Sequence, residues 1–397
     1  MLILVLAKGD KQMSFMHEGF GVKGAYFHGI ISKDDLNTGR QIEFDYSKGL
    51  FMFAILFVHA FQVLGKGMGK EAYAYKLIYM VCTMTGASIF MFVMGLGTKY
   101  SRAGIKDMVI SGFRLIGYQY FTNIACVAAL VLPYFILQFF TEMSSSKEAV
   151  VSMAKLLLFY INIFFLAGGI YWILALLRKM KIPVWLYVVL GLLINIFSPS
   201  WIGLSVGIAV FDYILGSIFG GTSYASFSIL NFLPYAFFGL AFGDLLRKVI
   251  DKKRFYTICC YLSIVVLAVF LIWVYLNHKG FDALYDYIGS TYTRPDFMRT
   301  IANTACVILL AGALFFARGL ISGLVDRQLM YISKHISKYY VVHQILFFLA
   351  LGLNKYHSMD FWGCLALFVL GTVCTDGIVR FYNHVRTSRV SGGIERL

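Results

Sequence analysis

The sequence predicts an all-α, polytopic membrane helical bundle, and three features of composition and patterning support this fold class. Hydrophobic residues make up 59% of the 397 residues and charged residues only 14%, against about 25% in soluble domains. Apolar runs recur from residue 49 to residue 382 without a long polar interval. The net charge of +15 comes from short Lys and Arg clusters between these runs, which is typical of juxtamembrane anchors and argues against nucleic-acid binding.

Eleven apolar segments are long enough to cross a bilayer, but one of them is not expected to cross. If all crossed, the basic clusters at 178–181 and 247–254 would lie on opposite faces, although short cationic loops tend to stay in the cytoplasm. The weakest segment is 201–221, which carries Asp212 and ends in two glycines, as suits a re-entrant or interfacial piece. We therefore expect about ten transmembrane helices with both termini in the cytoplasm. The predicted spans are 49–65, 76–97, 115–140, 152–177, 182–198, 225–246, 254–276, 301–322, 338–354 and 361–382.

The sequence predicts three segments along the chain. Residues 1–46 are expected to form a cytoplasmic leader, residues 47–382 the transmembrane bundle, and residues 383–397 a cytoplasmic tail. The outer loop at 277–299 is rich in tyrosines and acidic residues. It suits either a surface for polar acceptors such as sugars or a hydrated loop with interfacial tyrosines. The oligomeric state stays open, with a homodimer among the alternatives.

One histidine lies inside the first span. His59 follows Lys48 by eleven residues, so at about 1.5 Å per residue it lies about 16 Å deep in a core about 30 Å thick. An ionisable group at that depth indicates function, and burial favours the neutral, proton-accepting imidazole. The alternative is a structural hydrogen bond to a neighbouring helix, and the position of His59 alone leaves both open.

The first span and the residues before it also resemble a known family. The stretch RQIEFDYSKGLFMFAILFVHAF (40–61) is similar to the first-span signature of the transmembrane acyltransferase superfamily, especially its acyltransferase-3 family. In that signature an Asp and a cation precede the helix, and a His follows the cation after ten intervening residues. Asp45, Lys48 and His59 occupy the matching positions.

Four later stretches continue the resemblance in the order that the family has. The second-span stretch is closer still to the related heparan-α-glucosaminide N-acetyltransferase branch, and the last stretch contains a second helix-embedded histidine. They are SIFMFVMGLG (88–97), SGFRLIGYQYFTN (111–123), NFLPYAFFGLAFGDLLRK (231–248) and ISKYYVVHQILFF (336–348). The resemblance implies ten spans and acyl transfer from acyl-coenzyme A, most often the acetyl form.

The resemblance also implies roles for particular residues. His59 is expected to be the general base and His343 a second catalytic candidate, although a structural interhelical bond is the favoured interpretation of His343. Two positions depart from the family pattern, because the usual Arg is Lys48 and a common Asp is Ser88. Lysine is a poorer bidentate clamp than arginine.

The remaining candidates would bind the two substrates. Arg114 and its neighbours offer positive charge for the phosphates of coenzyme A, although a cluster that only sets topology or binds anionic lipid would look the same. The candidates for coenzyme binding are Lys48, Lys99, Arg102, Lys106 and Arg114, and those for the acceptor are Asp45, Ser88, Asn123 and Asn231. The seven cysteines show no zinc spacing, and no metal site is predicted.

Two function classes follow from these observations. The favoured one is a multi-pass acyltransferase of a bacterial plasma membrane, which moves an acyl group from cytoplasmic acyl-coenzyme A to a hydroxyl or amine of an extracytoplasmic glycan, glycolipid or small metabolite. The alternative is a proton-coupled transporter or flippase that uses the same buried histidine. Internal repeats would favour transport, and the two halves show no convincing correspondence.

Overall fold

The described part of the chain is helical apart from turns, loops and isolated β-bridges. A computed structural model describes residues 29–66, 73–138, 147–221, 224–225, 227–278, 281–353 and 359–394. Residues 1–28 of the predicted leader therefore lie outside the described residues. Within the described ranges no strand is formed, and the polytopic helical bundle predicted from the sequence is confirmed.

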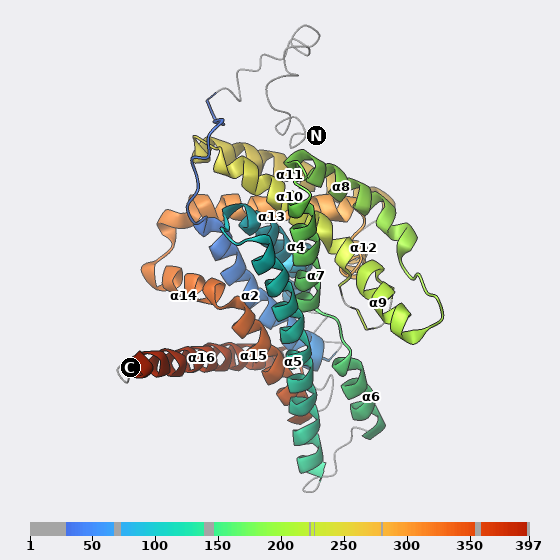
Figure 1. Cartoon of the computed structure of the whole chain (residues 1–397). Helices are drawn as coiled ribbons and strands as arrows, with labels where there is room; N and C mark the ends of the chain where they lie inside the picture. The colour runs from blue at the N-terminus through green and yellow to red at the C-terminus, as the bar shows by residue number, and fades with distance from the viewer. Residues whose placement is uncertain are drawn as a thin grey trace. The chain divides into compact units, whose positions relative to one another are not determined.

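The helices follow one another with short connections, and Figure 1 labels most of them along the chain. They are α2 (Ile42–Leu64), α4 (Tyr73–Tyr100), α5 (Ile105–Gln138), α6 (Lys147–Leu158), α7 (Ile163–Lys179), α8 (Val184–Phe197), η2 (Ser198–Trp201), α9 (Ala209–Phe219), α10 (Ile229–Arg247), α11 (Lys252–His278), α12 (Phe281–Ser290), α13 (Phe297–Ala317), η3 (Arg318–Leu320), α14 (Gly323–Lys334), α15 (Ile336–Leu353) and α16 (Phe361–Ile394).

Membrane-spanning length is reached by most of these helices. Nine spans in the described ranges are long and apolar enough to cross a membrane. Helix α7, with 17 residues, falls just short of the 18-residue length of the shortest of them. Helix α9 has 11 residues and rises about 16 Å, which is too short to cross a core of about 30 Å. This length agrees with the expectation that segment 201–221 does not cross.

The predicted span at 152–177 is instead two helices. Helix α6 ends at Leu158 and α7 begins at Ile163. Asn162 caps α7, because its side-chain oxygen accepts a hydrogen bond of 2.8 Å from the backbone N–H of Ile163. A cap of this kind fixes the start of a helix, so one apolar run became two elements.

Contacts divide the chain into two compact units, each assembled from separate segments. Unit 1 consists of Met1–Ser47, Thr83–Gln119 and Ile161–Ile321, and unit 2 consists of Lys48–Cys82, Tyr120–Tyr160 and Ser322–Leu397. Helices α2, α4 and α5 each contribute to both units.

Unit 1 is organised around α10, which is the most buried of its spans. Two glycines let α4 and α10 touch backbone to backbone. A Cβ added to Gly95 would lie 1.9 Å from the carbonyl oxygen of Ala236, and one added to Gly239 would lie 1.9 Å from that of Phe92. Only glycine permits this approach, so these two residues fix the position of α10 against α4.

Unit 2 places the first span against α15 and α16. Its core joins Met52, Leu56 and Ala60 of α2 to Phe347 of α15 and Val379 of α16, all of which are fully buried. Lipid is as apolar as these side chains, so close van der Waals packing holds the three helices together within the membrane.

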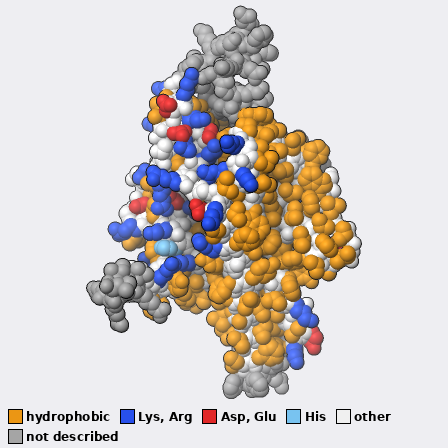
Figure 2. All heavy atoms as spheres, viewed as in Figure 1, with side chains coloured by type: hydrophobic (Ala, Val, Ile, Leu, Met, Phe, Trp, Pro, Cys, Tyr) orange, Lys and Arg blue, Asp and Glu red, His pale blue; other side chains and the backbone are white. Residues whose placement is uncertain are grey.

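The outer surfaces of the spans are apolar. Helix α11, for example, leaves many large hydrophobic side chains exposed along its length, including Val265, Ile272 and Leu276. Figure 2 shows hydrophobic side chains over a broad area of the face in view. A soluble protein rarely exposes so large an apolar surface, so this chain is a multi-pass membrane protein.

Candidate functional site

The two histidines predicted as site residues lie together in unit 2. Nδ1 of His59 on α2 is 3.1 Å from Nε2 of His343 on α15, and the two rings are nearly parallel. His343 is completely buried, whereas His59 keeps partial exposure. The residues are 284 positions apart in sequence, so only the packing of α2 against α15 brings them together.

The hydrogen bonds of His343 determine which nitrogens carry protons. Its Nδ1 lies 2.9 Å from the carbonyl oxygen of Tyr339, one helical turn earlier. A carbonyl can only accept, so Nδ1 of His343 carries a hydrogen and donates it. In a neutral ring Nε2 of His343 is then an acceptor, and we assign Nδ1–H of His59 as the donor in the 3.1 Å contact.

This tautomer leaves Nε2 of His59 without a proton. Among the described residues Nε2 of His59 has no hydrogen-bond partner, because all polar contacts of this ring involve Nδ1. The ring is therefore oriented on one side by His343 and presents a bare lone pair on the other. That arrangement is what a general base requires.

Gln344 is the third member of the histidine site and was missed by the sequence analysis. Its side-chain amide lies 2.9 Å from Nδ1 of His59 and 3.2 Å from Nε2 of His343. The two ends of an amide exchange by a half turn, so in this tautomer either its oxygen accepts from Nδ1–H of His59 or its N–H donates to Nε2 of His343. The position next to His343 in the sequence was its only signal.

A carboxylate network supports the carbonyl that fixes His343. The hydroxyl of Tyr339 donates to Oδ1 of Asp376 on α16. The same carboxylate accepts hydrogen bonds from Arg380 Nε at 2.7 Å and from Gln328 Nε2 at 2.9 Å. Tyr339 is thus held at its hydroxyl while its carbonyl holds His343, so Asp376 positions the histidine pair without touching it.

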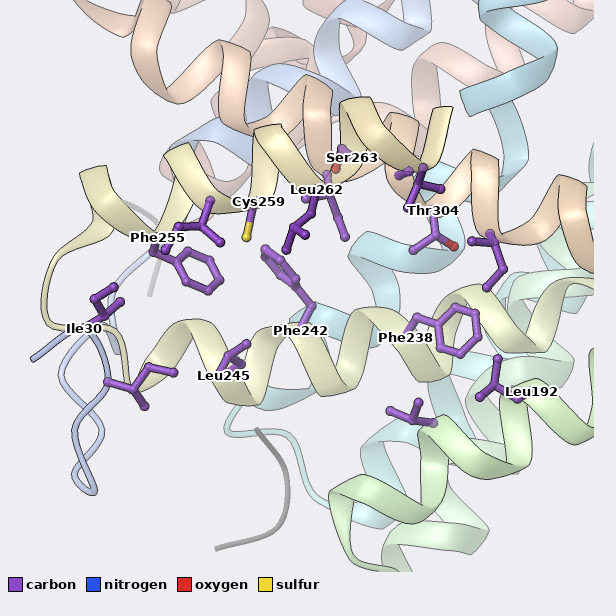
Figure 3. A pocket seen from close by; sticks show the side chains of 17 residues that line it. Ile30, Leu192, Phe238, Phe242, Leu245, Phe255, Cys259, Leu262, Ser263 and Thr304 are labelled. Atoms are coloured by element: carbon purple, nitrogen blue, oxygen red, sulfur yellow. The ribbon is translucent and has the colours of Figure 1, made fainter. Parts of the chain in front are cut away.

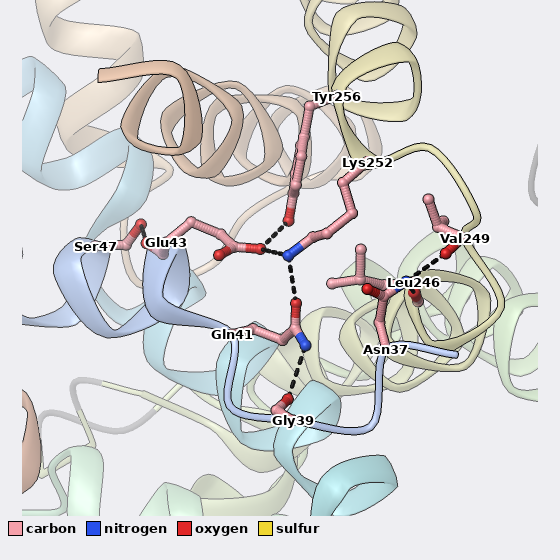
Figure 4. A network of polar contacts seen from close by, with 9 residues as sticks. All are labelled: Asn37, Gly39, Gln41, Glu43, Ser47, Leu246, Val249, Lys252 and Tyr256. Carbon is pink, nitrogen blue, oxygen red and sulfur yellow. Dashed lines mark hydrogen bonds and ion pairs between the residues drawn. The ribbon is translucent and has the colours of Figure 1, made fainter. Parts of the chain in front are cut away.

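The start of α2 is anchored in unit 1 by a second network, drawn in Figure 4. The carboxylate of Glu43, only 5% exposed, accepts a hydrogen bond of 2.7 Å from the Tyr256 hydroxyl and one of 3.0 Å from Lys252 Nζ. Lys252 also donates to the side-chain oxygen of Gln41 at 2.7 Å. These bonds tie the beginning of the helix that carries His59 to the beginning of α11.

Asp45, predicted to contact substrate, forms an ion pair next to this network. Its Oδ2 lies 2.5 Å from Arg40 Nε. The hydrogen bond to Asp45 raises the pKa of the Arg40 guanidinium. The structure leaves Lys48, the other cation of the first-span signature, partly exposed.

The predicted coenzyme-binding cations have different surroundings in unit 1. Lys99 is paired with Asp244 at 2.8 Å. Arg102, Lys106 and Arg114 are exposed. The three exposed cations could meet an anion from solvent, whereas Lys99 would have to leave its partner.

The polar residues predicted to bind the acceptor differ in whether their side chains already have hydrogen-bond partners. The Ser88 hydroxyl donates within its own helix, to the Thr85 carbonyl at 3.0 Å. Asn123 donates to the backbone carbonyl of Tyr160 at 2.8 Å, which is a structural bond at the end of α6. Asn231, in contrast, is buried with no partner for either amide atom among the described residues.

An apolar groove lies in unit 1 between α8, α10, α11 and α13, with a volume of about 310 Å³. Figure 3 shows the side chains of Phe238, Phe242, Phe255 and Leu262 around it. Its lining is almost entirely hydrocarbon, and Ser263 and Thr304 supply the few polar atoms. The groove can hold an acyl chain but has no group for acid–base chemistry. Nor do the described residues contain a group of three or more His, Cys, Asp or Glu that could hold a metal ion.

Comparison with known proteins gives one significant match. The family model Acyl_transf_3, described as an acyltransferase domain, matches residues 41–380. No curated protein and no solved structure matches the chain significantly. The matched range begins just before α2 and ends within α16, so it includes both histidines and every helix between them.

Proposed function

The chain belongs to the acyltransferase-3 family, and we propose that it transfers an acyl group from acyl-coenzyme A to a hydroxyl or amine, with His59 as the general base. The family makes the protein a membrane acyltransferase. The observation that carries the proposed chemistry is the 3.1 Å contact between His59 and His343, because it leaves Nε2 of His59 free to accept a proton.

The proposed reaction moves one proton through His59. Nε2 of His59 removes the proton from the acceptor hydroxyl or amine while the acceptor oxygen or nitrogen attacks the thioester carbonyl. The tetrahedral intermediate collapses, the carbon–sulfur bond breaks, and the proton on Nε2 passes to the departing thiolate of coenzyme A. Throughout, Nδ1–H of His59 donates to His343, which stabilises the imidazolium that forms between the two steps.

Acyl-coenzyme A, the acyl donor, is proposed to bind to the exposed cations of unit 1 through its phosphates. Arg102, Lys106 and Arg114 are exposed near the start of α5 and can attract the phosphates of coenzyme A. Acyl-coenzyme A is a cytoplasmic metabolite, and the positive-inside tendency places these cations on the cytoplasmic side. Both termini would then be cytoplasmic, and the acceptor would be a glycan, glycolipid or small metabolite on the other side of a bacterial plasma membrane.

The experiment that tests this function uses the purified, full-length protein with radiolabelled acetyl-coenzyme A. We expect hydrolysis or transfer by the wild-type protein and a loss of about 10²–10⁴-fold in His59→Gln, the usual contribution of a general base. His384→Gln is the matched control, because His384 is an exposed histidine on α16. It should keep the wild-type rate.

Two outcomes would contradict the proposal. One is a folded His59→Gln variant that consumes acetyl-coenzyme A at the wild-type rate. The other is proton-coupled uptake of a solute into liposomes without consumption of coenzyme, which is the behaviour of a transporter.

A further inference from the structure

Unit 1 contains a group of buried side chains whose hydrogen-bonding atoms are not all used. Asn231 is 1% exposed and Arg299 is 0% exposed. Burying a polar atom without a partner costs about 1–3 kcal/mol, so native proteins rarely keep several together. The atoms that lack a partner within the described residues are Arg299 Nε, both amide atoms of Asn231, Oδ1 of Asn195, Oδ1 of Asn303 and the hydroxyl of Ser228. We call these five residues the polar cluster.

The members of the polar cluster are linked across three helices. Asn303 on α13 donates its side-chain N–H to the Tyr235 hydroxyl on α10 at 2.9 Å. Asn303 lies one turn after Arg299, and Tyr235 lies one turn after Asn231. Asn195 connects α8 to α13 in the same way, through a 2.7 Å bond to the Thr300 hydroxyl. Asn231 and Ser228 lie together at the start of α10, because Nδ2 of Asn231 and the hydroxyl oxygen of Ser228 are each 3.3 Å from the position of a Cβ at Gly220.

Within the described residues the Arg299 guanidinium forms no ion pair with a carboxylate. Its guanidinium donates to the Thr83 carbonyl at 3.0 Å and only weakly to the Thr291 hydroxyl at 3.5 Å. The nearest carboxylate in sequence, Asp296, is used otherwise, because it accepts from the backbone N–H of Arg299 at 2.8 Å and from the Tyr287 hydroxyl at 2.7 Å. A buried cation that faces only neutral oxygens is unfavourable unless an anion joins it.

The polar cluster lies at the helix ends that are remote from the basic clusters. Helix α8 begins just after the basic residues at 178–181 and carries Asn195 near its other end. Helix α10 ends at the basic residues 247–254, and Ser228 caps its opposite end. By the positive-inside tendency the polar cluster is on the extracytoplasmic side.

We propose that unit 1 binds a small, hydroxylated oxyanion at the polar cluster, with its carboxylate or phosphate on Arg299 and its hydroxyls on the amides. An anion supplies the charge that Arg299 lacks, and hydroxyl groups both donate to and accept from an amide such as Asn231. A metal cation would be repelled by Arg299, and an apolar ligand would leave every amide unpaired. The proposal uses residues of unit 1 alone and does not depend on acyl transfer.

The test measures thermal unfolding of the full-length protein in detergent with four probes and no coenzyme. Glucuronate supplies a carboxylate with hydroxyls, glycerophosphate a phosphate with hydroxyls, glucose hydroxyls alone, and sodium chloride an anion alone. We expect a saturable rise of the unfolding temperature with glucuronate, with glycerophosphate or with both, and none with glucose or chloride. A response to only one of the first two identifies the group that Arg299 binds.

Asn231→Leu distinguishes a binding site from a structural one. Both amide atoms of Asn231 lack partners among the described residues, so a leucine, which has the same branched shape, should leave the ligand-free unfolding temperature unchanged or raise it. The same change should weaken the response to the probe at least about tenfold, the effect of losing one or two hydrogen bonds. This variant remains informative even if substitutions at Arg299 prevent folding.

Asn123→Leu is the matched control, because Asn123 is buried and its side-chain NH2 donates to the backbone carbonyls of Leu158 and Tyr160 in unit 2. It should lower the unfolding temperature and keep the response to the probe. The proposal is overturned if no probe stabilises the wild-type protein, if glucose or chloride stabilises it equally, or if Asn231→Leu keeps the full response.

Discussion

The histidine site of unit 2 and the polar cluster of unit 1 are both buried, but they differ in how completely their atoms are hydrogen-bonded. Around His59 and His343 the contacts run without interruption to the Asp376 carboxylate, and Nε2 of His59 has no partner among the residues that the structure describes. In the polar cluster, each of the five residues has at least one atom without a partner in the described part of the chain. A complete network that spares one lone pair suits proton transfer, whereas an incomplete one suits a ligand that completes it.

The largest effect is expected from a substitution that displaces α10, the helix that carries Asn231, and so disrupts the polar cluster. In Gly95→Ala the new methyl group would meet the Ala236 carbonyl oxygen, 1.9 Å from its ideal position. A backbone atom in a packed core cannot give way easily, so we expect destabilisation of about 3 kcal/mol, measured by unfolding in detergent. In Gly97→Ala nothing lies within 4 Å, and the better helix propensity of alanine should leave stability unchanged or improved. Equal unfolding temperatures for the two variants would disprove the close contact.

A second change tests the support of the histidine site. Asp376→Leu removes the acceptor of the Tyr339 hydroxyl and the partner of Arg380. We expect kcat to fall about tenfold while KM changes little, because partners that only orient a functional side chain typically contribute this much. Asp376→Asn keeps an oxygen that can accept from Tyr339 and should recover most of the rate. If leucine and asparagine had the same effect, the charge and not the hydrogen bond would be responsible.

A third change tests the anchor of α2 in unit 1. Tyr256→Phe deletes the 2.7 Å hydrogen bond to the Glu43 carboxylate but leaves Lys252 in place. A hydrogen bond to a charged group contributes about 2 kcal/mol, so the free energy of unfolding should fall by that amount, which lowers the midpoint of chemical unfolding. Tyr275→Phe on the same helix alters an exposed tyrosine and serves as the control. An unchanged midpoint in Tyr256→Phe would mean that Lys252 alone satisfies Glu43.

The smallest expected effect concerns His335, which lies outside the membrane-spanning helices at the end of α14. Burial, assisted by Lys338 and Lys334, lowers the pKa of His335. The unfolded chain therefore takes up the proton first as the pH falls, so the contribution of His335 to stability is present above about pH 6.5 and declines below it. His335→Asn should show a slightly shallower loss of unfolding temperature on acidification. A steeper loss would reverse the sign of this contribution.

Much of the fold could be predicted because hydrophobic length is a local property. The apolar runs located most of the spans, and the glycines and Asp212 indicated that 201–221 does not cross, which agrees with the 11-residue length of α9. The break between α6 and α7 was missed, although Asn162 before an apolar run is a helix-start signal. Asn162 lies within an apolar segment that is long enough to cross the membrane as one helix, so hydropathy alone predicted a single span there.

The sites were predicted less completely because they depend on contacts between distant segments. The sequence identified His59 and His343 as candidates, but their mutual distance and tautomers follow from the packing of α2 on α15. Arg299 was missed because it follows a polar loop and looks like a helix-end cation. The sequence offered one signal, since Arg299 lies inside a helix capped by Asp296 and is followed by an apolar run.

The most direct measurement of the central claim, that His343 sets the tautomer of a catalytic His59, is the transfer rate of two variants at His343. Glutamine offers a side-chain oxygen that can accept from Nδ1–H of His59, whereas leucine offers nothing. We predict that His343→Gln stays within about tenfold of the wild-type rate and that His343→Leu loses about 10²-fold or more. A folded His343→Leu protein with the wild-type rate would contradict the account.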